Sequence, residues 1–287
     1  MKLITGVSGR TGSQIAAELL SKREQVRVLV RNDKDANLWS ERGAEIAFGD
    51  FFDANSLKSA LSGVDSAYIM TPPLAQSHDL MKDRSIIEAN IVGACKESQI
   101  QHIVCLSAFG AHLNAGTGQI VGLHKMENTF AAAEINFVSL RAAYFMENWD
   151  PSIAKAINDG SLGSFIKRTD LEIEQVSTAD LARCAIECLN QTTLGNRCIS
   201  VAGPAAYSAI DVAAAMSEAL LREIKAAGIP EENWWNIWQG LGWTVNRCEL
   251  YQEFFNSISS GLAKFDNSDE IWRGSVSIDQ YVKSKLN

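Results

Sequence analysis

A strand, a glycine-rich turn and a helix follow one another at the start of the chain. Residues 2–6 are β-prone, residues 13–20 have an amphipathic pattern, and the turn between them has the glycine spacing GxxGxxG. In such a turn the glycines allow a tight bend, close approach of a pyrophosphate and close helix–sheet packing, while the helix N-terminus offers N–H donors and a positive dipole. We therefore expect a dinucleotide site that includes Gly6, Ser8, Gly9, Arg10, Thr11 and Gly12.

The first half of the chain alternates short apolar runs with longer segments of helical period. The apolar runs predict strands at residues 2–6, 26–31, 45–49, 66–70, 102–107 and 137–141. Their apolar character on both sides indicates a parallel sheet covered by helices on both faces. The sequence thus predicts an α/β fold, with a Rossmann-type doubly wound parallel sheet in residues 1–148.

The pattern changes after Trp149 to helices with weaker strand signals at residues 174–176 and 198–202. Three capping-box spacings predict helix starts there: Ser177 with Asp180, Ser208 with Asp211, and Ser277 with Gln280. We expect residues 149–287 to form a smaller, mainly helical substrate lobe packed across a cleft, with some strands able to return to the main sheet.

Composition excludes several classes of protein. With 287 residues, 46% hydrophobic and 21% charged, the chain is typical of a globular protein, and its net charge of −8 argues against nucleic acid as a partner. No apolar run reaches the ~18 residues of a membrane span, and the start lacks a signal-peptide layout, so a cytoplasmic location is expected. The six cysteines show no CxxC pair, which predicts reduced, structural thiols and no metal site.

Arg31 ends the second predicted strand, at the position that normally selects the cofactor. An acid there binds the ribose 2′-hydroxyl of NAD, whereas an arginine accepts the 2′-phosphate of NADP. We therefore expect NADP(H) to be preferred over NAD(H), with Arg10 and Lys34 as helpers. The alternative is a solvated strand-end charge, and Asp33 lies two residues away.

Two further loops should border the same crevice, since ligands lie beyond the carboxyl ends of parallel strands. Asp50 and Phe51 follow the third strand and should flank the adenine, although Asp50 is equally explained as a turn or cap residue. The fourth strand ends in a stiff loop that contains Thr71, Pro72 and Pro73.

Taken together, these segments resemble the NmrA-like group of atypical short-chain dehydrogenase/reductases, which includes bacterial NADPH quinone reductases and triphenylmethane reductases. The resemblance covers nearly the whole chain. Besides the glycine turn, it rests on residues 28–32 (VLVRN), 49–50 (GD), 63–65 (GVD), 71–73 (TPP), 102–111 (HIVCLSAFGA), 140–141 (LR) and 145–148 (FMEN).

The resemblance implies that the glycine turn holds the pyrophosphate, Arg31 the 2′-phosphate and residues 71–73 the inner ribose. It also implies that Ser107 and Lys125 lie near the nicotinamide as catalytic residues. One departure is clear: Val121 stands four residues before Lys125, where alcohol-forming short-chain dehydrogenases have a tyrosine acid. Reduction of a quinone needs a strong positioned acid less, because the oxyanion that forms has a low proton affinity.

Each of these side chains also has a structural explanation. Lys125 can be a solvated helix lysine, Ser107 a cap, and His124, an alternative donor, a capping or surface group. Flat apolar walls suit flat acceptors, so the substrate-side candidates are Phe109, Tyr144, Phe145 and Trp149, together with Asn148 in the same segment, although such a cluster is more often core. The tryptophans of residues 234–243 can form core, a lid or an oligomer contact.

The sequence therefore predicts an NADPH-dependent reductase that transfers hydride to a quinone or similar small electrophile. The alternative is a non-catalytic NADP-binding redox sensor that acts through a regulatory protein partner. A sugar-nucleotide epimerase is disfavoured because that chemistry uses the missing tyrosine. Whether the chain forms a homodimer stays open.

Overall fold

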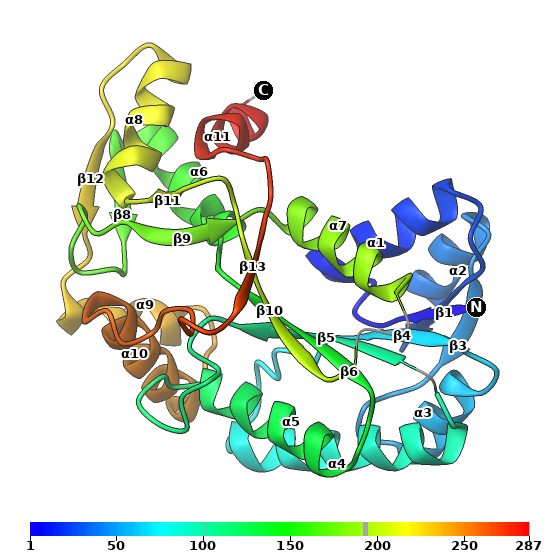
Figure 1. Cartoon of the computed structure of the whole chain (residues 1–287). Helices are drawn as coiled ribbons and strands as arrows, with labels where there is room; N and C mark the ends of the chain where they lie inside the picture. Colours follow the sequence, from blue (N-terminus) through cyan, green and yellow to red (C-terminus); the bar gives the residue numbers. More distant parts are fainter. Residues whose placement is uncertain (101, 192–194, 287) are drawn as a thin grey trace.

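The computed structural model describes residues 1–100, 102–191 and 195–286. An eight-stranded sheet forms its centre, with the order β13-β10-β6-β5-β4-β1-β2-β3 and every neighbouring pair parallel (Figure 1). Its strands are β1 (Lys2–Ile4), β2 (Val26–Val30), β3 (Glu45–Phe48), β4 (Ser66–Ile69), β5 (His102–Ala108), β6 (Phe137–Ala142), β10 (Arg197–Ala202) and β13 (Glu270–Arg273). The predicted parallel, Rossmann-like sheet is confirmed.

The strand order reverses at β1, which pairs with β2 on one side and with β4 on the other. Leu3 lies opposite Arg27 in β2 and opposite Ala67 in β4. In open parallel sheets the crevice for a ligand lies beyond the carboxyl end of the strands at this reversal. The glycine turn that follows β1 therefore lies at the topological switch point.

Helices cover both faces of the sheet (Figure 1). One face carries α1 (Arg10–Ser21), α2 (Asp33–Glu41) and α7 (Thr178–Leu189), and the other carries α3 (Ala54–Leu61), α4 (Leu80–Ser98) and α5 (Ile120–Ala132). Alternate residues of each strand face the two layers: Ile4 packs with the first group, and its neighbour Leu3 packs with the second. The two-sided apolar strands seen in the sequence follow from this arrangement.

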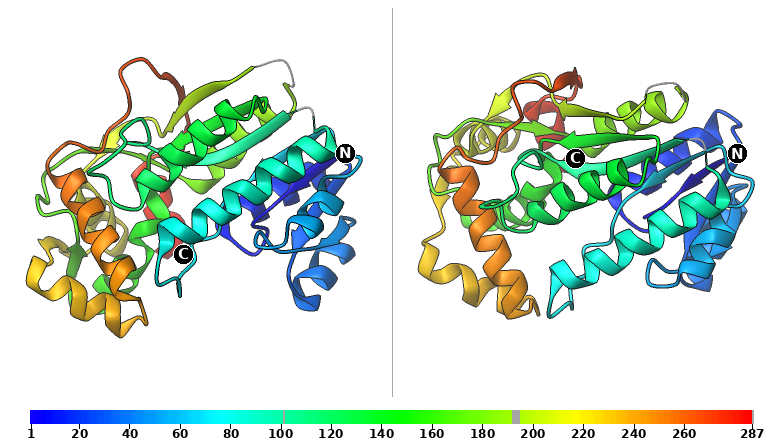
Figure 2. Two further views of the ribbon diagram at one scale, coloured as in Figure 1. Left: turned by 90° about the horizontal axis from the view of Figure 1, so that it is seen from below. Right: turned by 60° about the horizontal axis from the view of Figure 1, so that its bottom comes forward.

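The C-terminal lobe lies beside one end of the sheet (Figure 2). It contains a three-stranded sheet of β11 (Ala206–Tyr207), β9 (Ile173–Val176) and β7 (Tyr144–Phe145), and a pair of β12 (Lys225–Gly228) with β8 (Ser161–Ser164). Its helices are η1 (Met146–Trp149), α6 (Asp150–Asp159), α8 (Ala209–Leu220), η2 (Glu231–Asn233), α9 (Trp234–Gly240), α10 (Val245–Ser259) and α11 (Ile278–Leu286). Trp234 and Trp238 are fully buried against Phe165 and Phe255, so the tryptophan segment forms the core of this lobe.

The lobe is not one continuous segment of the chain. Helix α7 packs on α1, and β10 and β13 extend the main sheet beyond β6. Strand β10 joins the sheet because Ile199 and Val201 are buried in the same core as Ile4. Residues 178–202 and 270–273 therefore belong to the main sheet layers, although they follow residue 149.

The three predicted helix starts are confirmed. The hydroxyl of Ser177 accepts from the N–H of Asp180 at the start of α7, and a full capping box joins Ser208 with Asp211 at α8. Ser277 and Gln280 make the same two reciprocal hydrogen bonds at α11. Within the described ranges, no helix is long and apolar enough to span a bilayer.

Candidate dinucleotide-binding site

The glycine turn after β1 is shaped by contacts that a side chain would prevent. Gly6 has φ +68°, in the left-handed region, and a Cβ there would lie 2.6 Å from the methyl carbon of Met70. A Cβ on Gly12 would lie 2.3 Å from the carbonyl oxygen of Thr5, which is backbone and cannot move aside. These two glycines are therefore required for the turn itself, as the sequence pattern predicts.

The N-terminus of α1 is open to a ligand. Its N-cap residue is Gly9, and no side chain caps the helix, whereas Asn32, Asp53 and Asp79 cap α2, α3 and α4 through their side chains. Uncapped N–H groups and the helix dipole together favour an anion. Ser8 is exposed beside this end, while Thr11 is buried and accepts a hydrogen bond from the Tyr68 hydroxyl at 3.1 Å. This end of α1 therefore presents N–H groups that no side chain caps, as an anion site requires.

Arg31 and Asp50 face each other across the ends of β2 and β3. The Arg31 guanidinium lies 3.8 Å from Oδ2 of Asp50, and both side chains are exposed, by 69% and 42%. The other carboxylate oxygen of Asp50 accepts from the N–H of Phe52 at 2.8 Å, so Asp50 is also a turn residue. Phe51 beside it is buried in the core. A 2′-phosphate near Arg31 would meet both a guanidinium and a carboxylate.

The loop after β4 approaches the glycine turn through Met70. The side chain of Met70 lies against Gly6, and its backbone N–H donates to the Thr5 hydroxyl at 2.9 Å. Thr71 and Pro72 are partly buried and Pro73 is exposed. The geometry brings this loop to the glycine turn, while the contribution of Met70 was not anticipated from the sequence.

Arg10 points away from the nucleotide-selecting end of the site. Its guanidinium donates to the carbonyl oxygen of Glu147 at 3.0 Å and lies 3.5 Å from the carboxylate of Asp150. Both partners belong to the C-terminal lobe. In this conformation Arg10 does not assist Arg31, contrary to the role of helper expected for it.

Ser107 belongs to a buried polar network between the sheet and α5. Its hydroxyl donates to Oε1 of Glu127 at 2.7 Å, and Ser139 donates to the same oxygen at 2.6 Å. Arg141 bonds Glu127 at 2.7 Å and Asp269 at 3.0 Å. Ser107 is only 2% exposed. Its hydroxyl is thus directed into the network rather than to an open surface.

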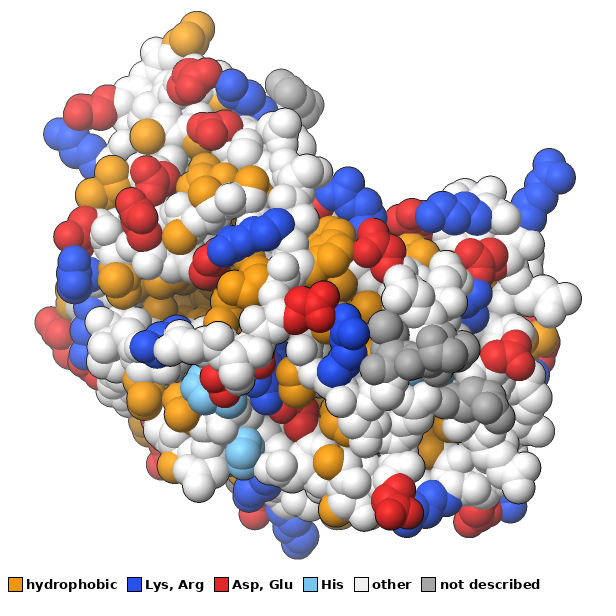
Figure 3. Space-filling model, viewed as in Figure 1, with side chains coloured by type: hydrophobic (Ala, Val, Ile, Leu, Met, Phe, Trp, Pro, Cys, Tyr) orange, Lys and Arg blue, Asp and Glu red, His pale blue; other side chains and the backbone are white. Residues whose placement is uncertain are grey.

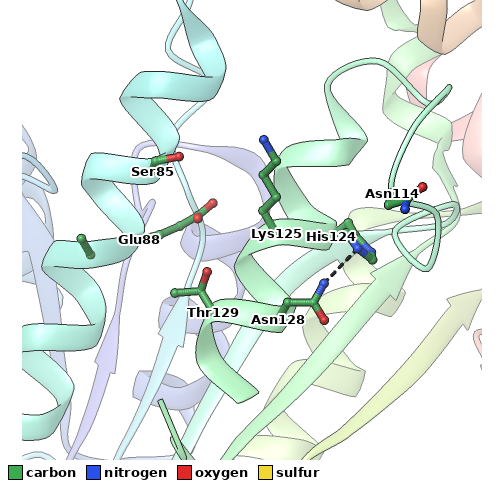
Figure 4. A pocket seen from close by; sticks show the side chains of 8 residues that line it. Ser85, Glu88, Asn114, His124, Lys125, Asn128 and Thr129 are labelled. Atoms are coloured by element: carbon green, nitrogen blue, oxygen red, sulfur yellow. Dashed lines mark hydrogen bonds between the residues drawn. The ribbon is translucent and has the colours of Figure 1, made fainter. Parts of the chain in front are cut away.

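Lys125 lies on the other side of α5, where its side chain is exposed in an open hollow of about 510 Å³ between α4 and α5 (Figure 4). Glu88 faces Lys125 across this hollow. The structure does not bring Lys125 and Ser107 together. Glu88 could not be predicted as a neighbour of Lys125, because only the packing of α4 on α5 places it there.

Both ring nitrogens of His124, beside Lys125, make hydrogen bonds. Its Nδ1 must donate to the carbonyl oxygen of Ala111, at 2.9 Å, because a carbonyl only accepts. Its Nε2 then accepts from the amide of Asn128 at 2.9 Å. With both ring nitrogens engaged, His124 is a structural group here rather than the alternative proton donor.

The aromatic candidates for an acceptor site are mostly buried. Phe109, Tyr144 and Trp149 lie in the core of the C-terminal lobe, exposed by 6%, 7% and 3%, while Phe145 is half-buried and Asn148 exposed. Trp149 donates to the side chain of Gln175 at 2.9 Å. Burial also raises the pKa of the Tyr144 phenol, which keeps it protonated. Figure 3 shows a hollow between the lobe and the sheet half, with hydrophobic side chains on its floor.

Comparison with known proteins agrees with this geometry. Residues 6–192 match a protein family described as NAD(P)H-binding. The NAD(P)H azoreductase of Xenophilus azovorans is 26% identical over 258 residues, covering 89% of this chain and 86% of its own. Quinone oxidoreductase 2 of Escherichia coli is 24% identical over 275 residues, covering 93% and 91%.

Solved structures show the same fold at low identity. The triphenylmethane reductase of Citrobacter sp. in complex with NADP(H) has a TM-score of 0.84 at 19% identity and covers 99% of both chains. The Escherichia coli NADPH-dependent quinone oxidoreductase in complex with NADPH has a TM-score of 0.83 at 21% identity over the full length of both chains.

Proposed function

The chain belongs to the NAD(P)H-binding family, as an NmrA-like atypical short-chain dehydrogenase/reductase and an NAD(P)H-dependent oxidoreductase, and on this premise we propose that it uses NADPH to reduce a quinone or a similar electrophile. The observation that supports this most directly is the glycine turn at the topological switch point, followed by a helix whose N-terminus is uncapped. The residues present suit a dinucleotide, since Gly6 and Gly12 keep the turn narrow enough for the backbone to reach a pyrophosphate.

When bound, the nicotinamide supplies the hydride, and the chain positions the two reactants. The N–H groups at the start of α1 hold the pyrophosphate, and Arg31 holds the 2′-phosphate. Residues 71–73 border the ribose, and the acceptor lies between this loop and the C-terminal lobe. An electron-poor acceptor agrees with the absence of a tyrosine before Lys125, because its reduced oxygen is a weak base.

The positions of Ser107 and Lys125 limit what each can contribute to catalysis. Ser107 supports the Glu127–Arg141 network and does so from a buried position, so its proposed contribution is to fix the end of β5.

Lys125 contributes positive charge from α5. If it assists hydride transfer, Lys125→Ala should lower turnover by more than about tenfold, or ~1.4 kcal/mol. Unchanged turnover would make Lys125 an ordinary solvated lysine.

The test of the function is NADPH oxidation by the purified protein, followed by nicotinamide absorbance, with a panel of small quinones, azo dyes and other electrophiles and with NADH as the control. Turnover with NADPH supports the reductase. The alternative is an NADP-binding sensor, and the burial of Phe109, Tyr144 and Trp149 favours it, because these walls offer little open surface. Tight NADPH binding without turnover on any acceptor would favour the sensor.

Cofactor preference is tested at Arg31 and Asp50. Arg31→Asp should weaken NADPH binding far more than NADH binding, because only NADPH presents a 2′-phosphate. Asp50→Asn should act in the opposite direction, since it removes the carboxylate 3.8 Å from Arg31. We expect it to tighten NADPH binding about threefold or more through lost charge repulsion. If either variant changes the binding of NADPH and NADH equally, the substituted residue does not determine the preference between the two cofactors.

A further inference from the structure

The side chain of Arg10 extends from the glycine turn to the C-terminal lobe, where it contacts Glu147 and Asp150. It is the first residue of α1, directly after Gly9, and its side chain is half exposed. One guanidinium nitrogen donates to the carbonyl oxygen of Glu147 in η1 at 3.0 Å, and the other lies 3.5 Å from Oδ2 of Asp150, the first residue of α6. One side chain thus joins the start of α1 to the start of α6.

Asp150, one of the two partners of Arg10, is itself held by contacts with α11. Asp150 accepts from the hydroxyl of Tyr281 and lies 3.4 Å from the ammonium of Lys285, both on α11. Arg10 therefore reaches, through Asp150, the helix that ends the described chain.

The carboxylate of Glu147 gives a second route between the same elements. It is buried, and its Oε1 accepts from the backbone N–H and the hydroxyl of Thr178 at 3.0 and 2.7 Å. The same hydroxyl accepts from Gln14 of α1 at 2.7 Å. Two side chains of α1, one turn apart, are thus both connected to Glu147.

We propose that Arg10, through Glu147 and Asp150, is a positioning residue that sets the C-terminal lobe at a fixed distance from the bound nucleotide. This set of contacts is called the Arg10 bridge below. It rests on the proposed function in one respect: the pyrophosphate is held at the start of α1, and the acceptor lies against the lobe.

Helix α1 would hold both the bound nucleotide and the C-terminal lobe. A nucleotide held by the N–H groups of α1 is fixed relative to that helix, and the Arg10 bridge fixes η1 and α6 relative to the same helix. Tyr144 and Phe145 directly precede η1. The separation of hydride donor and acceptor is then set by short contacts, and small errors in that separation reduce the rate strongly.

A direct phosphate role for Arg10 predicts different behaviour. If Arg10 bound phosphate, Asp150 would compete for its guanidinium, so removal of Asp150 would leave NADPH binding unchanged or tighter. If Arg10 acts as a bridge, removal of either partner should have the same effect, and this effect should fall on the acceptor side.

The experiment compares Arg10→Ala, Asp150→Ala and the double variant in the full-length protein. Asp150→Asn is added because it keeps an acceptor for Tyr281 while it removes the charge facing Arg10. Lys22→Ala is the matched control, since it removes a surface ion pair with Glu18 at the far end of α1. The measurements are the Kd of NADPH, the KM and kcat for the acceptor, and hydrogen exchange of residues 146–159.

We expect each single variant to raise the acceptor KM about five- to tenfold, with the NADPH Kd within about twofold of the wild type. The acceptor KM of the double variant should not exceed that of the more strongly impaired single variant, because both substitutions remove the same interaction. Asp150→Asn should resemble Asp150→Ala, and Lys22→Ala should resemble the wild type. Weaker NADPH binding in Arg10→Ala alone, or additive KM effects, would overturn the bridge.

Failure of the proposed function would be visible separately. If the wild type turns over no acceptor, the reductase proposal fails while hydrogen exchange still tests the bridge. Faster exchange of residues 146–159 in both single variants then supports it. Wild-type exchange in Arg10→Ala would refute it.

Discussion

The three glycines of the first turn meet different surroundings. A Cβ on Gly12 would overlap the backbone of Thr5 and Gly6, whereas a Cβ on Gly9 would meet only the carbonyl oxygen of Gly6, at 3.2 Å. Gly9 also has φ −100°, which any residue can adopt. Packing therefore explains Gly12 fully and Gly9 poorly, and the lack of a side chain at Gly9 is better explained by a ligand that approaches the backbone.

The pair Gly9→Ala and Gly12→Ala tests this distinction. Gly12→Ala should destabilise the fold by about 1–3 kcal/mol, as overpacking does. Gly9→Ala should change stability by less than about 1 kcal/mol but weaken NADPH binding at least about tenfold, because the added methyl group occupies the path of the pyrophosphate. Chemical denaturation and nicotinamide fluorescence measure the two effects. Undiminished NADPH binding by Gly9→Ala would place the pyrophosphate elsewhere.

At the scale of elements, the packing of α4 on α5 buries an acid. Glu88 is 5% exposed, and desolvation raises the pKa of its carboxyl to about 7. The positive charges of Arg84 and Lys125 lower this pKa, but by less than desolvation raises it. Arg84 itself crosses to α5, donating to the carbonyl oxygen of Gln119 and packing on Gly122. The contact between these helices therefore buries a carboxyl group that holds its proton up to a higher pH than an ordinary one.

The direction of the pH effect follows from the raised pKa. Between the ordinary carboxyl pKa and about 7, the folded protein binds a proton that the unfolded chain has lost, so stability falls as pH rises through this range. Glu88→Gln should remove that loss and, at pH 8, be more stable than the wild type by about 1–3 kcal/mol. Glu97→Gln, on the exposed side of α4, is the control. A parallel pH profile for Glu88→Gln and the wild type would contradict the prediction.

What could be predicted from the sequence was local. The main strands and the three helix starts depend on neighbouring residues, and these predictions were confirmed to within one or two residues. The Glu127–Arg141–Asp269 network could not be predicted, because Arg141 and Asp269 are 128 residues apart and meet only when β10 and β13 join the sheet. Ser107 lies at the expected strand end for the same local reason, but its partner is set by tertiary packing.

At the scale of the whole molecule, two of the polar contacts between the C-terminal lobe and the sheet half lie far apart. The Arg10 bridge is on the side of α1. On the other face, α10 lies beside the start of α4 (Figure 2), where the Thr244 hydroxyl donates to the carbonyl oxygen of Ser77 at 2.7 Å. Asn246 accepts from the backbone N–H of Leu80 at 3.0 Å. The loop that contains Thr71 to Pro73 leads directly into this second contact.

The two contacts should act independently, since they share no residue and lie on opposite faces of the sheet. Asn246→Ala leaves the N–H of Leu80 without its acceptor and should cost about 1–3 kcal/mol of stability. Combined with Arg10→Ala, its loss of stability should add to within about 0.5 kcal/mol, because distant sites without shared partners are additive. Urea denaturation of the two single variants and the double variant measures this. A coupling well above that value would mean that the lobe closes on the sheet half as one cooperative unit.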